Sequence, residues 1–180
     1  MNAFDQLALV LSEREQRTAR RSALATEYRA TVVQLTISAP GVRKDGPDIR
    51  SAAEKGAALL EKELAERGLR LSHRETQDGQ AGPCIFWVLE AEAVLVKEIA
   101  VGLENGYSLG RLWDFDVYSP EGLKLDRESL GSETRTCYVC RSPAAVCAGR
   151  RLHESVEVVQ RFSELLKRGM EELGSKGVIE

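Results

Sequence analysis

Apolar side chains recur at helical spacing near both ends of the sequence. Phe4, Leu7, Ala8 and Leu11 share one face, and the polar run after them contains few helix breakers, which predicts a helix over residues 3–29. A second amphipathic helix is predicted from His153 onward. Its apolar face is expected to consist of Val156, Val159, Phe162, Leu166 and Met170.

The middle of the chain alternates between strand-like and helix-like runs. Four strands and a short return are predicted from β-branched or alternating residues, at 31–38, 69–75, 84–90, 111–118 and 123–125. Helical spacing predicts helices over 48–67 and 91–103, with Asp48 capping the first and Gly68 ending it. The buried face of the helix over 48–67 is expected to carry Ile49, Ala53, Ala57, Leu60 and Leu64.

The order β-α-β-β-α-β over residues 31–118 is that of a ferredoxin-like split unit. We therefore predict one α+β domain over residues 1–180, with a mixed or antiparallel sheet between N-terminal and C-terminal helices. Its expected parts are the first helix at 1–30, the α+β core at 31–126, a loop containing Cys and His at 127–153, and the last helix at 154–174.

Composition narrows the class of protein. Of the 180 residues, 43% are hydrophobic and 29% are charged, which is typical of a globular domain. The net charge of −3 argues against non-specific nucleic-acid binding. No apolar run is long enough to span a membrane, and the N-terminus does not resemble a signal peptide. We expect a cytoplasmic protein that binds neither membrane nor nucleic acid.

The segment 111–118 contains two aspartates at strand spacing. Alternation directs Trp113, Phe115 and Val117 into the core, and places Asp114 and Asp116 on the opposite face together with Leu112 and Tyr118. Carboxylates two residues apart on one face can share a Mg²⁺ ion that also binds substrate phosphates. Gly110 would permit close approach of the backbone, and Arg111 could reach a phosphate. The alternative is an exposed strand with two solvated acids.

Three cysteines and a histidine follow in the pattern C-x2-C-x6-C-x5-H. Cys137, Cys140, Cys147 and His153 are compatible with a tetrahedral Zn²⁺ site, or the thiols simply pack. Cys84 lies in an apolar strand and is expected in the core.

Basic residues near the N-terminus offer further contacts for phosphate. Arg14, Arg17 and Arg21 form one stripe of the first helix, and Arg43, Lys44 and Arg50 follow the first strand. Each of them could equally belong to a solvated face.

The sequence from Leu109 to His153 closely resembles the CitX family, the apo-citrate lyase phosphoribosyl-dephospho-CoA transferases. The resemblance is carried by the GRLWD-x-DV core, the PEG turn, the Cys-x2-Cys pair and the Ala144–Ala148 run. Weaker matches are Arg14-Glu15-Gln16-Arg17 and the Pro-Gly-x-x-Lys segment that ends at Lys44.

The resemblance implies a nucleotidyltransferase-type enzyme. Its substrate would be triphosphoribosyl-dephospho-CoA, its acceptor a serine of the citrate lyase acyl carrier protein (gamma subunit), and diphosphate would leave. Asp114 and Asp116 would hold Mg²⁺, with Arg111 beside them as the third catalytic residue. The substrate would also be bound by Gly110, Lys44, Arg50, Arg14 and Arg17.

Three other functions remain open at this stage. One is the related prosthetic-group transferase of malonate decarboxylase. The second is a zinc-stabilised binding module without catalysis, and the third is a family member that only binds the carrier.

Overall fold

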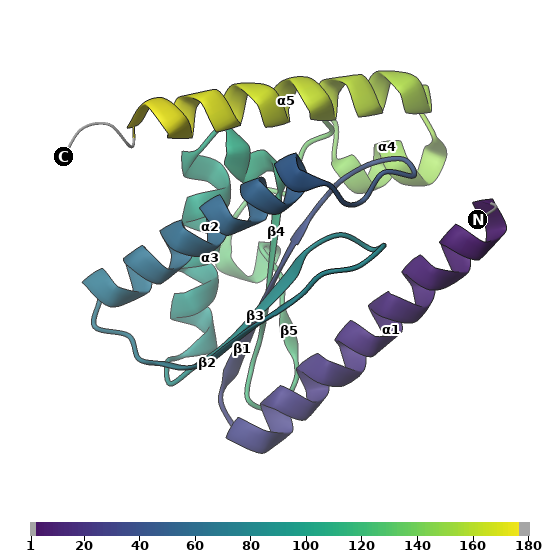
Figure 1. Cartoon of the computed structure of the whole chain (residues 1–180). Coiled ribbons are helices and arrows are strands. Elements are labelled where there is room, and N and C mark those ends of the chain that lie inside the picture. Colours follow the sequence, from purple (N-terminus) through teal and green to yellow (C-terminus); the bar gives the residue numbers. More distant parts are fainter. Residues whose placement is uncertain (1–2, 177–180) are drawn as a thin grey trace.

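The computed structural model describes residues 3–176, and the side chains of residues 5–174. It confirms the α+β class (Figure 1). In chain order the elements are α1 (Ala3–Tyr28), β1 (Thr31–Ile37), α2 (Pro47–Glu66), β2 (Leu71–Gln77), β3 (Cys84–Leu89), α3 (Ala93–Gly106), the 3-10 turn η1 (Leu109–Leu112), β4 (Trp113–Tyr118), β5 (Lys124–Leu125), the 3-10 turn η2 (Glu128–Leu130), α4 (Ala144–Arg150) and α5 (Ser155–Lys176).

The strands form one antiparallel sheet in the order β2-β3-β1-β4-β5. β1 is central and pairs with both β3 and β4, so the first strand in the chain bridges the two halves of the sheet. β5 is only two residues long and pairs with the end of β4, at Val117 and Tyr118. The first half of β4 therefore has no strand on its outer side within the described chain.

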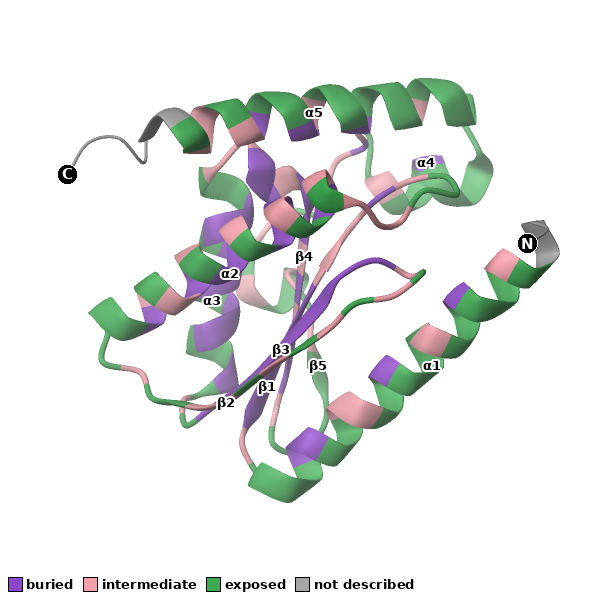
Figure 2. Ribbon diagram, in the orientation of Figure 1, coloured by how far each residue is buried: buried purple, intermediate pink, exposed green. Residues whose placement is uncertain are grey.

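Helices cover the two faces of the sheet unequally. One face packs against α2, α3 and α5 in the larger core, to which β4 contributes Trp113, Phe115 and Val117, all fully buried as predicted. The other face packs against the C-terminal half of α1 through Leu24 and Ala25, in a smaller cluster that includes Cys84, also buried as predicted. In Figure 2, β3, most of β1 and the inner sides of α2 and α3 are buried, whereas the edge strand β2 and most of α5 are not.

The predicted helical faces are only partly confirmed. All five predicted core residues of α2 are buried. In α5, Phe162 and Leu166 are buried, but Val156 is 79% exposed. Leu7 and Leu11 of α1 are exposed because the N-terminal half of that helix diverges from the sheet (Figure 1). The side chain of Phe4, predicted on the same face, lies outside the described residues.

Several predicted boundaries were wrong for local reasons. Pro47 opens α2 after Gly46, so Asp48 lies in the first turn instead of capping the helix. β2 begins two residues late because the amide of Leu69 still bonds to Leu64 at the end of α2. α3 continues to Gly106, three residues beyond the predicted end. The expected loop 127–153 contains η2 and α4.

The predicted strand 111–118 also begins late, at Trp113. Residues 109–112 form η1 instead, which packs against α3 and α5. Leu112 was expected beside the aspartates but is fully buried in the larger core. The chain thus turns sharply before it enters β4.

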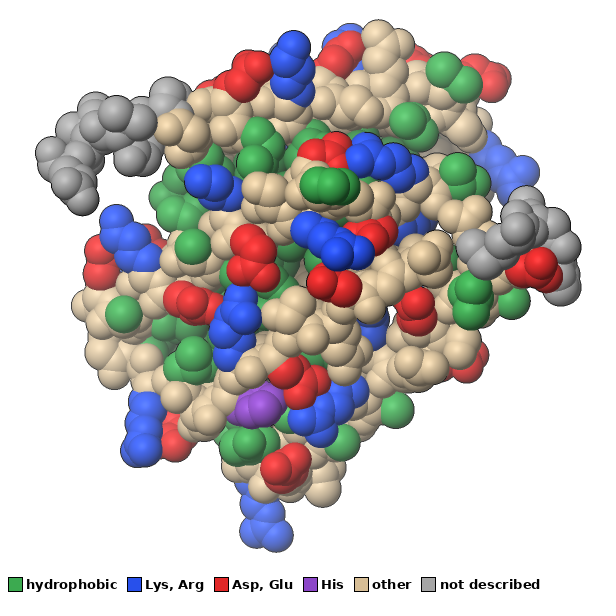
Figure 3. All heavy atoms as spheres, viewed as in Figure 1, with side chains coloured by type: hydrophobic (Ala, Val, Ile, Leu, Met, Phe, Trp, Pro, Cys, Tyr) green, Lys and Arg blue, Asp and Glu red, His purple; other side chains and the backbone are tan. Residues whose placement is uncertain are grey.

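Acidic and basic side chains are interspersed on the face drawn in Figure 3. None of the described helices is both long and apolar enough to cross a membrane.

Candidate functional site

Asp114 and Asp116 lie on the α1 face of β4, opposite the apolar residues that alternate with them. Their partners across the sheet are Thr36 and Gln34 of β1. The carboxylates are half-buried, with side chains 37% and 17% exposed. The prediction that both acids share one face of a strand is therefore confirmed.

Each aspartate has a basic partner. Arg135 lies 3.0 Å from Oδ1 of Asp114, and Nζ of Lys124 lies 2.7 Å from Oδ1 of Asp116. Burial alone would lower the pKa of Arg135, but Glu104 and Asp114 outweigh burial and raise it. Burial is likewise the largest single effect on Lys124 and lowers its pKa, but the hydrogen bond to Asp116 and the neighbouring negative charges together raise it. The two acids are therefore fixed in place by basic side chains.

Buried charged side chains take the place of the missing strand beside β4. Nζ of Lys97 donates to the carbonyl of Phe115 at 2.9 Å, and the amide of Phe115 donates to Oε1 of Glu104 at 2.8 Å. Both side chains come from α3 and are less than 5% exposed. Burial lowers the pKa of Lys97 and raises the pKa of Glu104. Glu104 also pairs with Arg135, so this network positions the strand that carries the aspartates.

Gly110 and Arg111 have specific places in η1. A Cβ added to Gly110 would lie 2.5 Å and 2.6 Å from the carbonyl oxygens of Leu103 and Glu104, so glycine permits the contact with α3. Arg111 donates hydrogen bonds to the hydroxyl and carbonyl of Thr136 and to the carbonyl of Cys137. It thus ties η1 to the cysteine segment and makes no direct contact with either aspartate among the described residues.

The structure divides the predicted N-terminal phosphate ligands into two groups. Arg14 and Lys44 lie near each other: burial and then the charge of Arg14 lower the pKa of Lys44, whose Nζ also donates to the carbonyl of Ala39. Arg17 is only 6% exposed and donates to the carbonyls of Ala81 and Gly82, where it holds the β2–β3 turn. Arg50 is paired with Asp45 at 2.5 Å. Arg14 and Lys44 are therefore two neighbouring cations.

Cys137, Cys140, Cys147 and His153 come together in space. Their candidate donor atoms all lie within 4.8 Å of one another, so the cluster could hold a metal ion. Four ligands about 2.3 Å from a tetrahedral Zn²⁺ ion would be separated by roughly 3.8 Å. The Sγ of Cys140 lies 3.5 Å from the Sγ of Cys147 and 3.3 Å from Nε2 of His153, close to that spacing.

The surroundings of the cluster favour ligation. The backbone and hydroxyl of Ser142 donate hydrogen bonds to Cys140 and, with His153, lower the pKa of that thiol to about 6. The amide of Val139 donates to Sγ of Cys137 at 3.4 Å. Glu157 lies 3.8 Å from Nδ1 of His153, whose other nitrogen, Nε2, contacts Cys140.

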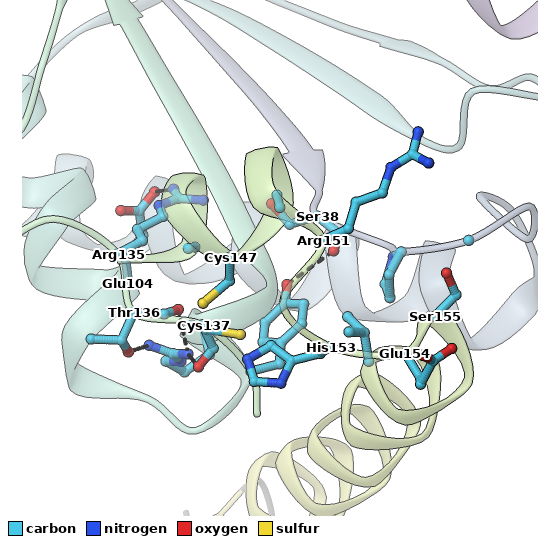
Figure 4. A pocket seen from close by; sticks show the side chains of 18 of the residues that line it. Ser38, Glu104, Arg135, Thr136, Cys137, Cys147, Arg151, His153, Glu154 and Ser155 are labelled. Carbon is cyan, nitrogen blue, oxygen red and sulfur yellow. Dashed lines mark hydrogen bonds and ion pairs between the residues drawn. The ribbon is translucent and has the colours of Figure 1, made fainter. Parts of the chain in front are cut away.

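A pocket of about 710 Å³ is lined by the cluster, by η1 and by the end of α3, and Figure 4 draws its lining side chains. It is lined by Gly110 and Arg111, by three members of the cluster, and by Arg127, Arg135 and Arg151. Arg135 reaches from this pocket to Asp114. The pocket and the aspartates are therefore adjacent.

Sequence reasoning missed Lys97, Lys124, Glu104, Arg127 and Arg135. Their charges resemble those of any solvated helix or loop, and only the unpaired edge of β4 gives them a role. To find them from the sequence, one would have needed to know which strands pair and that the first half of β4 lies at an edge of the sheet.

Comparison with known proteins matches most of the chain to one family. The family model described as apo-citrate lyase phosphoribosyl-dephospho-CoA transferase (CitX) matches residues 5–169. Proteins of that name from Escherichia coli O7:K1 and O6:K15:H31 are each 32% identical over 157 residues, covering 87% of this chain and 86% of theirs. One from Shigella boydii serotype 18 is 31% identical over the same lengths. The chain therefore belongs to the CitX family of apo-citrate lyase phosphoribosyl-dephospho-CoA transferases.

Proposed function

We propose that this protein transfers the phosphoribosyl-dephospho-CoA group from triphosphoribosyl-dephospho-CoA to a serine of the apo citrate lyase acyl carrier protein. The observation that carries the proposal is the pair Asp114 and Asp116, fixed by Arg135 and Lys124 on one face of β4. Membership of the CitX family supplies the substrate and the acceptor.

In the proposed reaction the serine oxygen bonds to the phosphorus nearest the ribose. The bond from that phosphorus to the leaving diphosphate breaks, and one of the two aspartates takes the serine proton. Asp114 and Asp116 would also hold Mg²⁺, which supplies positive charge next to the phosphate oxygens. Carboxylates are the ligands that Mg²⁺ prefers, so the residues present fit this ion.

Basic groups around the aspartates would stabilise charge on the leaving diphosphate. Lys124 and Arg135 fix the carboxylates and add positive charge beside them. Lys44 and Arg14 are two neighbouring cations, and an anion between them would relieve their repulsion. Arg111 would act from the pocket side, where it fixes η1.

We further propose that Cys137, Cys140, Cys147 and His153 bind Zn²⁺ in a structural role. Four protein ligands complete a tetrahedral shell and leave no position for substrate. The ion would fix the segment that carries Arg135. We place the reaction in the cytoplasm, where such thiols stay reduced.

The test is the intact mass of apo citrate lyase carrier after incubation with this protein, Mg²⁺ and the triphosphate precursor. The carrier should gain the mass of one prosthetic group and release one diphosphate. The apo carrier of malonate decarboxylase, supplied separately, should be modified far more slowly. An unchanged citrate lyase carrier would contradict the proposal, and faster modification of the other carrier would reassign the acceptor.

A further inference from the structure

The pocket beside the Cys/His cluster carries more positive charge than the protein neutralises. Four arginines line it, Arg111, Arg127, Arg135 and Arg151, against two acids, Glu104 and Glu154. With His153 neutral and Asp114 counted as a partner of Arg135, the formal surplus is one positive charge. Arginine is well suited to bind phosphate groups, because its planar fork donates two parallel hydrogen bonds. The pocket therefore favours an anionic ligand.

Arg151 is the arginine in this pocket that the rest of the protein does not use. Among the described residues its side chain has no ion pair or hydrogen bond, whereas Arg111, Arg127 and Arg135 each bind protein groups. It also has a left-handed backbone with φ 51°, at the end of α4, where glycine is the usual residue. Figure 4 places Arg151 on the opposite side of the pocket from Arg135 and Glu104.

A second observation comes from the opposite wall. Within the described chain, two buried side-chain atoms lack a hydrogen-bond partner, Nε of Arg127 and Oε2 of Glu104. Both residues line this pocket. Oε2 of Glu104 still lies 3.6 Å from Nη2 of Arg127, so Nε of Arg127 is the atom at this wall without a polar partner. Buried polar atoms are nearly always paired in native proteins, so this donor points to a ligand. Oε2 of Glu104 would accept from a hydroxyl, such as that of a ribose.

The remaining lining is apolar or small. Pro40, Tyr138 and Val158 provide an apolar wall, while Gly41 and Ala144 leave room beside it. A volume of about 710 Å³ lies in the range of pockets for small organic ligands. These properties together fit a base and a ribose joined to a diphosphate, which carries two negative charges.

We propose that this pocket binds the adenosine diphosphate portion of dephospho-CoA. The assignment rests on the proposed function, because it identifies the pocket as the part of the active site that holds the non-reacting end of the substrate. Arg135 joins the two regions, since it lines the pocket and pairs with Asp114. The triphosphate would then extend from the pocket toward the aspartates.

The test is isothermal titration calorimetry of the full-length protein with 3'-dephospho-CoA. This compound lacks the triphosphate and cannot be transferred, so its binding is measured whether or not the protein has the proposed activity. Arg151→Ala should weaken binding about tenfold, the effect of losing one charge-assisted contact. Alanine adds no backbone strain, because Arg151 already has a Cβ in the left-handed conformation.

The matched control is Arg150→Ala, which removes the neighbouring exposed arginine that does not line the pocket. It should change the dissociation constant less than twofold. Inorganic triphosphate should bind the wild type and Arg151→Ala equally, because the aspartate side receives it.

Three results would overturn the assignment. The first is wild-type protein that does not bind 3'-dephospho-CoA, and the second is equal binding of this compound by wild type and Arg151→Ala. The third is an Arg151→Ala variant that loses affinity for inorganic triphosphate alone, because the pocket would then hold the opposite end of the substrate. If the carrier is not modified but Arg151-dependent binding is present, the transfer proposal fails and the pocket assignment stands.

Discussion

Replacing Gly110 by alanine would force apart two elements that position β4. The new Cβ would lie 2.5 Å and 2.6 Å from two carbonyl oxygens at the end of α3, so η1 must move by at least about half an ångström. Overpacking against rigid backbone costs up to about 3 kcal/mol, and the smaller entropy of the unfolded alanine chain offsets up to about 1 kcal/mol. We expect a loss of about 2 kcal/mol in the free energy of unfolding.

Gly102 provides the matched control in the preceding helix. It lies exposed within α3, and an added Cβ meets no heavy atom within 4 Å. Gly102→Ala should therefore stabilise the protein by about 0.5–1 kcal/mol, because alanine favours helix. The same substitution is thus expected to have opposite signs at positions that are eight residues apart.

Urea unfolding followed by tryptophan fluorescence would measure both variants. Trp87 and Trp113 are fully buried, so their emission reports exposure of the larger core. The dependence of the unfolding free energy on urea concentration should have the same slope as in wild type. The change in midpoint can then be attributed to a change in stability. A Gly110→Ala protein within about 0.5 kcal/mol of wild type would refute the close-packing argument, as would equal destabilisation by Gly102→Ala.

Three further predictions concern the supporting contacts. Arg20 lowers the pKa of Glu75 to about 2, so Glu75→Gln should cost about 1 kcal/mol at pH 7, a value discounted for solvent exposure. Because the pKa of Glu75 is depressed in the folded protein, the stabilisation by this carboxylate is complete above about pH 4.5 and is lost as the pH falls toward 2. A difference in unfolding free energy between Glu75→Gln and wild type that persists at pH 2 in urea unfolding would contradict this. Wild-type protein should bind zinc stoichiometrically and lose thermal stability when a chelator removes the ion, and Cys140→Ser should show neither effect. A wild-type protein whose thermal stability does not change with chelator would argue against a structural ion. Lys97→Met should lower the unfolding free energy by about 1–2 kcal/mol, because the Phe115 carbonyl loses its donor, and unchanged stability in urea would show that relief of lysine desolvation compensates.

Much of the fold followed from periodicity, because most elements bury one regular face. The core positions of α2 and the alternation in β4 are of this kind. The start of β4 was mispredicted because tertiary packing of Gly110 against α3 outweighs the strand preference of the local sequence. α4 was missed although its Ala-Ala-Val-Cys-Ala run favours helix, because the cysteine pattern had been interpreted as a loop.

The candidate site was only partly predictable for a different reason. Spacing identified Asp114, Asp116 and the four candidate metal ligands, because their chemistry is local in sequence. Arg111 precedes the aspartates in η1, but its side chain donates hydrogen bonds to the backbone of residues 136–137. Arg135 is 21 residues beyond Asp114, and nothing in its own segment indicates that it would lie at the open edge of β4.

The central claim is that Asp114 and Asp116 perform the transfer. The most direct measurement is the rate at which apo carrier gains mass with Asp114→Asn and Asp116→Asn, in the presence of Mg²⁺ and precursor. The control is Asp126→Asn, an exposed aspartate whose amide replacement keeps an oxygen for the Ser129 amide. We predict a loss of at least about a hundredfold in both site variants, each still folded by urea unfolding, and a normal rate for the control. Transfer within tenfold of wild type by either site variant would contradict the account.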